Sequence, residues 1–276
     1  MCDTCGCNIT PGNQHLIETG GVQEKTEDGH SAVTVLKKLL SANDHQAMHN
    51  RHHFDVHGVL AINLMSSPGS GKTALLEKTI EQLRDTFKIA VIEGDLETEN
   101  DAQRIRNKGV EAIQIVTGTA CHLDAHMVHD ALHQINLDDI DILFIENVGN
   151  LVCPASFDLG HHLNVTLLSV TEGDDKPAKY PVMFRVADMV LLTKIDLLPY
   201  LDDFDVKRAE QSLRQLASDV PFISVSNKGS SDLTDWFGWL QSQVKQQNKK
   251  RLSGKIVRPT IQTGGGHFHE HSHSHG

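Results

Sequence analysis

Seven short apolar segments alternate with amphipathic segments across the middle of the chain, between Gly58 and about Gln247. Each apolar segment has polar residues mainly at its ends, a pattern typical of strands buried on both faces of a parallel sheet. The intervening segments have helical spacing, and strands that alternate with helices build βαβ units. The apolar segments are VLAINLMSS, KIAVIEGD, AIQIVTG, DILFIENVG, NVTLLSVT, MVLLTKID and PFISVS. The pattern predicts an α/β fold with a mainly parallel sheet and helices on both faces.

The two ends of the chain lack this alternation. The first part is polar, with one helical pattern around Ser31 to Leu40, and it then carries His45, His49, His52, His53 and His57. The last part runs through three glycines into HFHEHSHSHG, with histidine at every second position. We therefore expect a flexible N-terminal arm over residues 1–57, one folded domain over 58–250 and a flexible His-rich tail over 251–276.

Composition narrows the class of protein. The formal net charge of -11 argues against a nucleic-acid-binding surface. No apolar run is long enough to span a membrane, and the N-terminus lacks the basic and apolar blocks of a secretory signal. We expect a soluble, cytoplasmic protein without a nucleic-acid partner or membrane insertion. In that reducing compartment its five cysteines stay thiols and are available to metals.

A glycine-rich segment, SSPGSGKT, follows the first predicted strand and leads into the helical pattern ALLEKTIEQL. It is one residue short of the phosphate-binding consensus, because Ser66 stands where Gly is usual. Backbone N–H groups of such a loop face phosphates, while Lys72 reaches the β and γ groups and the Thr73 hydroxyl binds Mg²⁺. A Gly-Ser loop without a ligand is the alternative, but the strand-loop-helix context favours a nucleotide site. The predicted contacts are Pro68, Gly69, Ser70, Gly71, Lys72, Thr73 and Ala74.

A second loop indicates which base is bound. LLTKIDLL places Lys194 and Asp196 after a predicted strand, where the carboxylate can accept both hydrogens of a guanine N1 and N2 edge. Thr193 stands where Asn is usual, which we expect to weaken a loop tether. The alternative is that Asp196 only caps the following helix. A further loop at a strand end favours GTP or GDP, since it could close over the base with Ser226, Asn227 and Lys228.

Acidic residues at two other strand ends complete the predicted nucleotide site. Asp95 ends one strand, with Asp101 six residues on, and Glu146 ends another, followed by Gly149. Carboxylates there can hold Mg²⁺ and orient a hydrolytic water, and the Gly149 N–H can sense the γ-phosphate. We assign catalysis to Lys72, Asp95 and Glu146 and magnesium binding to Thr73, Asp95 and Glu146. Either carboxylate could instead be an ordinary cap, and the sequence leaves open which one acts.

A separate metal site is predicted after the third strand. The segment TACHLDAHMVHDALHQI would form one histidine stripe on a helix, with His122, His126, His129 and His133. Such a stripe is usually a solvated face. Cys121 at its start and Cys153, four residues beyond Gly149, change this interpretation, because thiolates with imidazole bind Zn²⁺ or Ni²⁺. The alternative is that each Cys packs as a small hydrophobic residue.

The N-terminus MCDTCGC contains three cysteines in a C-x-x-C-x-C pattern, Cys2, Cys5 and Cys7. With a terminal amine, three thiolates make a four-coordinate site that suits square-planar Ni²⁺ or tetrahedral Zn²⁺. Half of a zinc ribbon is the alternative, but the chain lacks the second Cys pair. A redox dithiol lacks its usual βαβ context here. We expect the histidine-rich ends to store metal more weakly.

Together these motifs resemble those of the HypB family, the nickel-incorporation GTPases of hydrogenase maturation. The resemblance extends from MCDTCGC and LMSSPGSGKT through EGDLETENDAQRI, TGTACHLDA and FIENVGNLVCP to TKIDLLPYL and SVSNKG. It implies a P-loop NTPase fold of the SIMIBI type and a Mg²⁺-dependent GTPase of low turnover. It also implies nickel or zinc at Cys121, His122 and Cys153, and tight nickel binding at Cys2, Cys5 and Cys7.

The resemblance further implies partners. These are a second copy of the chain in a nucleotide-dependent homodimer, a HypA-type zinc protein, and the [NiFe]-hydrogenase large subunit that receives nickel. Leu197 and Leu201 match the family's apolar dimer contact, although packing within the monomer explains them equally well. Our hypothesis is that GTP orders the segment from Glu146 to Cys153 and that hydrolysis releases the ion.

Three other functions compete with this hypothesis. A urease-type nickel GTPase would share the fold, but MCDTCGC and ENVGNLVCP favour the hydrogenase branch. A nickel storage protein would keep the cysteines and the tails. The intact phosphate loop argues against a pure metal buffer that has lost hydrolysis, since such a buffer would tolerate the loss of Lys72, and a nickel storage protein with a regulatory G domain stays an alternative. A radical-enzyme chaperone GTPase would lack the metal ligands.

Overall fold

The computed structural model describes residues 32–95, 100–217, 219–228 and 233–253, with side chains described from residue 40 onward except at residue 251. Cys2, Cys5, Cys7 and nearly all of the expected C-terminal tail lie outside these residues. No helix within the described ranges has the length and apolar character needed to cross a membrane.

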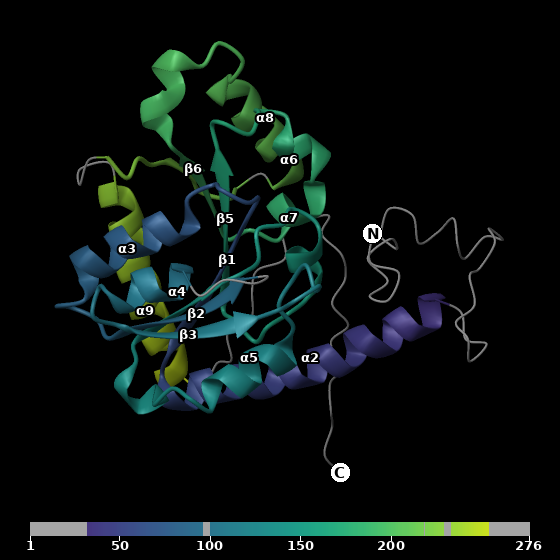
Figure 1. Cartoon of the computed structure of the whole chain (residues 1–276), viewed down its shortest axis with the longest axis vertical. Helices are drawn as coiled ribbons and strands as arrows, with labels where there is room; N and C mark the ends of the chain where they lie inside the picture. Colours follow the sequence, from purple (N-terminus) through teal and green to yellow (C-terminus); the bar gives the residue numbers. More distant parts are fainter. Residues whose placement is uncertain (1–31, 96–99, 218, 229–232, 254–276) are drawn as a thin grey trace.

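A seven-stranded sheet in the order β3-β2-β4-β1-β5-β6-β7 forms the centre of the molecule, and every pairing in it is parallel (Figure 1). All seven apolar segments singled out in the sequence lie in this sheet, so the predicted α/β fold is confirmed. The strands are β1 (Leu60–Ser66), β2 (Ile89–Asp95), β3 (Glu111–Val116), β4 (Ile142–Glu146), β5 (Leu163–Ser169), β6 (Met189–Thr193) and β7 (Phe222–Ser224). Because the strands are parallel, the loops that follow them meet at one edge of the sheet.

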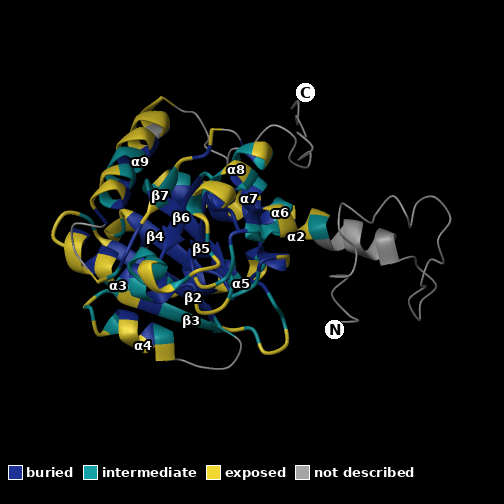
Figure 2. Cartoon of the chain, turned by 90° about the horizontal axis from the view of Figure 1, so that it is seen from above, coloured by how far each residue is buried: buried dark blue, intermediate teal, exposed yellow. Residues whose placement is uncertain are grey.

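Helices cover both faces of the sheet. Successive β1 residues alternate between the two sides, as the period of a strand requires. Ile62 and Leu64 pack with α3, α4 and α9, whereas Ala61 packs in the cluster that α2 and α5 cover. In Figure 2 the strands form the buried centre, and the exposed positions lie on the outer sides of the helices. The helices are α2 (Ala32–His57), α3 (Lys72–Leu83), α4 (Asn100–Arg106), α5 (Ala125–Leu132), α6 (Lys176–Lys179), α7 (Pro181–Arg185), α8 (Val206–Leu216) and α9 (Thr234–Leu252), with short 3-10 turns η1 (Leu137–Asp139), η2 (Cys153–Ser156) and η3 (Ile195–Tyr200).

Helix α2 differs from the flexible arm that we expected over residues 1–57. Within this range, residues 32–57 form a continuous helix that lies beside α5 (Figure 1). Ala47 and Phe54 are fully buried, and so is Asn50 between them. The expected boundary at residue 57 therefore falls at the end of a helix packed on the domain. The apolar pattern did not reveal this packing, because the buried face of α2 is largely polar.

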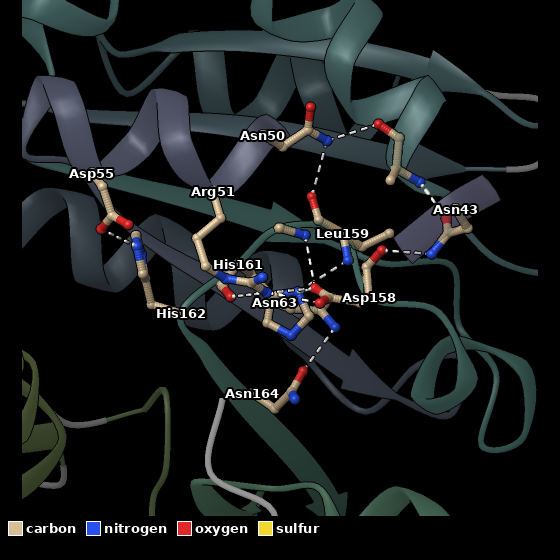
Figure 3. Close-up of polar contacts among 12 residues, drawn as sticks. Asn43, Asn50, Arg51, Asp55, Asn63, Asp158, Leu159, His161, His162 and Asn164 are labelled. Atoms are coloured by element: carbon tan, nitrogen blue, oxygen red, sulfur yellow. Dashed lines mark hydrogen bonds and ion pairs between the residues drawn. The ribbon is translucent and has the colours of Figure 1, made fainter. Parts of the chain in front are cut away.

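Polar side chains on α2 bond to backbone groups of the domain. The Asn43 amide nitrogen donates to the Asp158 carbonyl at 2.8 Å, and the Asn43 oxygen accepts from the Ala125 N–H at 2.8 Å. The Arg51 guanidinium contacts both Asp158 carboxylate oxygens, at 2.7 and 2.8 Å (Figure 3). Gly160 has φ +90° and lies against α2, where an added Cβ would be 2.6 Å from the Ala47 carbonyl oxygen. This contact leaves no room for a larger residue at position 160.

Candidate nucleotide and metal site

The predicted phosphate loop connects β1 to α3. Gly69 and Gly71 have φ of 73° and 101°, backbone conformations that favour glycine, and α3 begins at Lys72. The Ser66 hydroxyl, which replaces the usual Gly, accepts from the Lys72 ammonium at 3.1 Å and from the Ser70 hydroxyl. The substitution therefore supplies a hydrogen-bond acceptor inside the loop. The N-terminus of α3 and the loop amides form a surface suited to an anion.

Two buried carboxyl groups lie under this loop. Glu93 of β2 and Glu146 of β4 occupy facing positions in the parallel register, and their exposures are 2% and 3%. Burial raises the pKa of both groups, and Glu146 adds to the rise at Glu93. The Lys72 ammonium lies 4.0 Å from Glu146, whose Oε1 also accepts from the Thr73 hydroxyl at 3.0 Å. These two partners favour ionised Glu146, so the proton resides on Glu93.

The oxygen donors beside the loop suit Mg²⁺. The Thr73 hydroxyl and the Glu146 carboxylate are in contact, and the second Glu146 oxygen is buried without a hydrogen-bond partner. Hard oxygen ligands of this kind match the preference of magnesium. Asp95 ends β2 at the same edge of the sheet, whereas Asp101 lies in the first turn of α4 and pairs with Arg104 at 2.7 Å. Asp101 thus already has a cationic partner.

The two loops that we expect to bind the base lie in contact with each other. Asp196 accepts from the Ser226 hydroxyl at 2.7 Å and pairs with the Lys228 ammonium at 2.8 Å. These hydrogen bonds, with that of Lys228 the stronger influence, lower the pKa of Asp196 and keep it ionised. Lys194 lies at φ 60° and donates to the Gly69 carbonyl at 2.6 Å. The Asp196 carboxylate in the loop after β6 therefore lies beside the loop after β7, at the place where we expect the base.

Thr193, which stands where Asn is usual, forms a hydrogen bond to the phosphate loop. Its hydroxyl donates to the Ser70 carbonyl of the phosphate loop at 2.7 Å, and the side chain is 3% exposed. A direct, buried hydrogen bond therefore joins the phosphate loop to the loop that we expect to bind the base.

The loop after β4 touches both the phosphate loop and Cys121. An added Cβ on Gly149 would lie 2.8 Å from the Pro68 Cα, so only glycine fits there. The next residue, Asn150, donates its backbone N–H to the Ser66 carbonyl at 2.8 Å and its side-chain amide to the Cys121 carbonyl at 3.3 Å. Asn150 therefore connects the phosphate loop to the segment that carries the predicted metal ligands.

Three metal-ligating side chains converge beyond Asn150. One potential ligand atom from each of Cys121, His122 and Cys153 lies within 4.8 Å of the others. The two sulfurs are 3.0 Å apart, and both residues are thiols rather than halves of a disulfide. Burial lowers the pKa of His122, which keeps its imidazole neutral and able to bind a metal. Its ring stacks on Phe157 at a centroid distance of 3.8 Å. Two thiols with one imidazole form a soft donor set for zinc or nickel.

The predicted four-histidine stripe is only partly helical. Helix α5 begins at Ala125, because the Asp124 side chain accepts from the Met127 N–H at 2.8 Å and caps the first turn. His122 therefore precedes the helix and lies with the cysteines. His126 and His129 lie on α5, and His133 caps its C-terminus. Among the described residues, the compact ligand group contains His122 and not these three histidines.

Sequence reasoning missed three residues of the site. Glu93 interrupts an otherwise apolar strand, and a charged residue in such a run is a usable signal for a buried functional group. Asn150 and Phe157 offer no comparable signal, because their roles depend on contacts with Cys121 and His122 that are distant in sequence.

Comparisons with known proteins agree with this arrangement. Residues 60–224 match the model of the CobW/HypB/UreG nucleotide-binding domain. The chain is 53% identical over 222 residues to hydrogenase maturation factor HypB of Azotobacter vinelandii, covering 80% of this chain and 72% of that protein. It is 52% identical over 205 residues to HypB of Escherichia coli K12, covering 74% and 70%. The crystal structure of HypB from Helicobacter pylori in complex with nickel is similar at a TM-score of 0.70 and 39% identity, covering 82% of this chain and 100% of that one.

Proposed function

The chain belongs to the HypB family of hydrogenase maturation factors, and from this premise we propose that it is a GTP-hydrolysing nickel metallochaperone. It binds Ni²⁺ and, through GTP hydrolysis, passes the ion on for insertion into the large subunit of a [NiFe]-hydrogenase. The observation that carries the proposal is the bridge made by Asn150, whose backbone contacts the phosphate loop and whose side chain contacts Cys121. A change at the phosphates can therefore reach a metal ligand through one residue.

The nucleotide is GTP, with Asp196 as the residue that recognises the guanine edge. Ser226, Asn227 and Lys228 close the base site, and the loop from Pro68 to Ala74 holds the phosphates. Thr73, Glu146 and Asp95 would hold Mg²⁺, which when bound neutralises phosphate charge. The Lys72 ammonium stabilises charge on the γ-phosphate, and Asp95 and Glu146 are the carboxylates that we assign to orienting the hydrolytic water.

The cargo is nickel, with zinc as an alternative occupant of the same ligands. Cys121, His122 and Cys153 form the site on the domain, and Cys2, Cys5 and Cys7 form a tighter site that lies outside the described residues. Three protein ligands leave a coordination position open for a ligand from solvent or from an acceptor protein. An open position suits a site that must release its ion.

The partners follow from this function. We propose a nucleotide-dependent homodimer, a HypA-type zinc protein and the hydrogenase large subunit. Leu197 and Leu201 are half buried against α8 and its neighbours, while Tyr200 between them is 81% exposed. Exposed aromatic surface beside an apolar turn supports a dimer contact at η3. A storage protein with a regulatory G domain, or a urease-type chaperone, remains the competing function.

The deciding experiment measures Ni²⁺ affinity by chelator competition, with GDP and with a non-hydrolysable GTP analogue. It compares the intact chain with a Cys2/Cys5/Cys7→Ala variant and a Cys121/Cys153→Ala variant. We expect the first variant to lose a tight site and the second to lose a weaker site whose affinity differs about tenfold between the two nucleotides. Equal affinity with both nucleotides would overturn the coupling, because a ligand without differential affinity shifts nothing.

An Asn150→Ala variant tests the bridge itself. We expect it to bind Ni²⁺ at Cys121 and Cys153 but to lose the response to nucleotide. Asn107→Ala is the matched control, because Asn107 is an exposed asparagine whose amide oxygen accepts from the neighbouring Gln103. If the Asn150 variant kept the full nucleotide response, the connection would have to run through another residue.

A further inference from the structure

Histidines on α2 and α5 face one another across the contact between these helices. The ring centroids of His129 and His133 are 4.7 Å apart, and those of His53 and His129 are 6.0 Å apart. His53 and His133 are exposed, and His129 is half buried. His129 and His133 are four residues apart at the end of one helix, so both project from the same face. Three imidazoles from two helices thus share one accessible surface.

Asn50 determines which nitrogen of His129 is available. The Asn50 amide nitrogen donates to the Ala125 carbonyl at 2.7 Å and to the Leu159 carbonyl at 3.1 Å, as Figure 3 shows. Because both partners are acceptors, the orientation of this fully buried amide is settled, and its oxygen must face the other way. That oxygen lies 3.1 Å from His129 Nδ1. His129 Nδ1 therefore carries the proton and donates, which leaves the Nε2 lone pair free.

The hydrogen bond from His129 to Asn50 is of the kind that supports a metal-binding histidine. Histidines that bind metals usually donate their other ring N–H to an oxygen, which fixes the tautomer and the ring orientation. The Asn50 oxygen is such an acceptor, and two carbonyl groups hold it in place.

The surroundings of His53 also favour its neutral imidazole. Partial burial lowers the pKa of His53, and the neighbouring His129, His57, His52 and His133 lower it further. Neutral imidazole is the form that coordinates late transition metals such as Ni²⁺, Cu²⁺ and Zn²⁺.

We propose that His129, His133 and His53 form a second metal site on the domain, an all-imidazole site for a divalent late transition-metal ion such as Ni²⁺. The exposed rings of His53 and His133 rotate to join Nε2 of His129, and water completes the coordination. An ion bound there joins α2 to α5. None of the three belongs to the group of Cys121, His122 and Cys153, and the site goes beyond the proposed function because it needs neither GTP nor thiols.

The test uses the intact chain and Ni²⁺ at free concentrations set by a chelator. Diethyl pyrocarbonate modifies imidazoles that are not bound to metal, and peptide mass spectrometry reports each histidine separately. We expect His53, His129 and His133 to become protected together, at one free Ni²⁺ concentration. The histidines at positions 267–275 are read in the same sample, so metal binding there is not confused with the site.

Substitutions then test whether the two helices cooperate. His53→Ala on α2 should raise the Ni²⁺ concentration that protects His133 on α5 by about tenfold or more, since loss of an outer supporting partner alone costs about that much. His52→Ala is the matched control, because His52 is an adjacent exposed histidine on the same helix. Circular dichroism checks that both variants fold.

Three outcomes would overturn the site. The first is that His129 and His133 stay reactive at concentrations that protect the histidines at positions 267–275. The second is that the three histidines become protected at clearly different concentrations, as separate surface imidazoles would. The third is that His52→Ala and His53→Ala shift the protection of His133 equally. These results would leave the proposed GTPase function untouched, because no step of the assay involves nucleotide.

Discussion

Two buried polar clusters in this molecule have opposite electrostatics. Beneath α2, Arg51 pairs with Asp158, a cation with an anion. Beneath the phosphate loop, Glu93 faces Glu146, two groups of the same charge type. Burial alone would raise the pKa of Asp158, but Arg51 and the other partners outweigh it and lower that pKa. Burial raises the pKa of both glutamates. Complementary buried charges hold a helix in place, whereas like charges persist where a ligand compensates them.

The largest expected effect breaks the complementary cluster. Arg51→Met leaves the Asp158 carboxylate buried without its cation, and we expect the free energy of unfolding to fall by about 3–5 kcal/mol. Urea denaturation monitored by circular dichroism measures the change. The matched control is Arg104→Met, which removes a similar pair with Glu77 at 2.8 Å on the surface. Surface pairs contribute about 0–1 kcal/mol, so equal losses in the two variants would contradict the comparison.

The second-largest expected effect is an increase in the free energy of unfolding. Glu93 binds a proton in the folded state that the unfolded chain releases above its ordinary pKa of 4.5, so the stability of the native chain falls as pH rises past this value. Glu93→Gln removes this loss. With Mg²⁺ chelated, we expect the variant to be no more stable than the native chain near pH 4.5 and to gain about 1.4 kcal/mol per pH unit above it, reaching about 2–4 kcal/mol at pH 7.5.

Denaturant melts across this pH range measure that slope. Glu111→Gln, at an exposed position where β3 begins, controls for the loss of a negative charge. A constant difference between the Glu93 variant and the native chain at every pH would show that Glu93 is ionised in the folded protein. The proton that we place on Glu93 would then be absent, and both glutamates would be ionised in the folded protein.

The smallest expected effect concerns the neutral hydrogen bond between the Thr193 hydroxyl and the Ser70 carbonyl of the phosphate loop. Thr193→Val removes the donor to the Ser70 carbonyl at nearly constant shape, and we expect a loss of about 1 kcal/mol in urea denaturation. Thr86→Val, at an exposed position, should change stability by less than about 0.5 kcal/mol. A loss at Thr193 as large as that at Arg51 would show that charge is not what separates the strong contacts from the weak ones.

The fold and the nucleotide site were largely predictable because their signals are local. Each strand is one continuous apolar run, and the phosphate loop is one continuous motif between a strand and a helix. The family resemblance drawn from these motifs is confirmed by the relatives that the chain matches. The sequence alone could only predict that Cys121 lies near Cys153, because the two residues are 32 positions apart and only the folded sheet brings them together.

Helix α2 shows where sequence reasoning stopped. Its buried face depends on Asn43, Asn50 and Arg51, whose partners at Asp158 and Leu159 are more than a hundred positions away. Polar residues at such positions resemble a solvated surface until their distant acceptors are known. The same limit applied to His122, which the capping of α5 by Asp124 separated from the stripe.

By itself, the sequence determined the order of strands and helices, the phosphate loop and the chemical types of the candidate ligands, because backbone propensity and apolar spacing act over a few residues. The tertiary structure alone decided that α2 packs on the domain, that Glu93 lies against Glu146 and binds a proton, and that Asn150 bridges two sites. Those features depend on hydrogen bonds and desolvation between residues that only folding brings together.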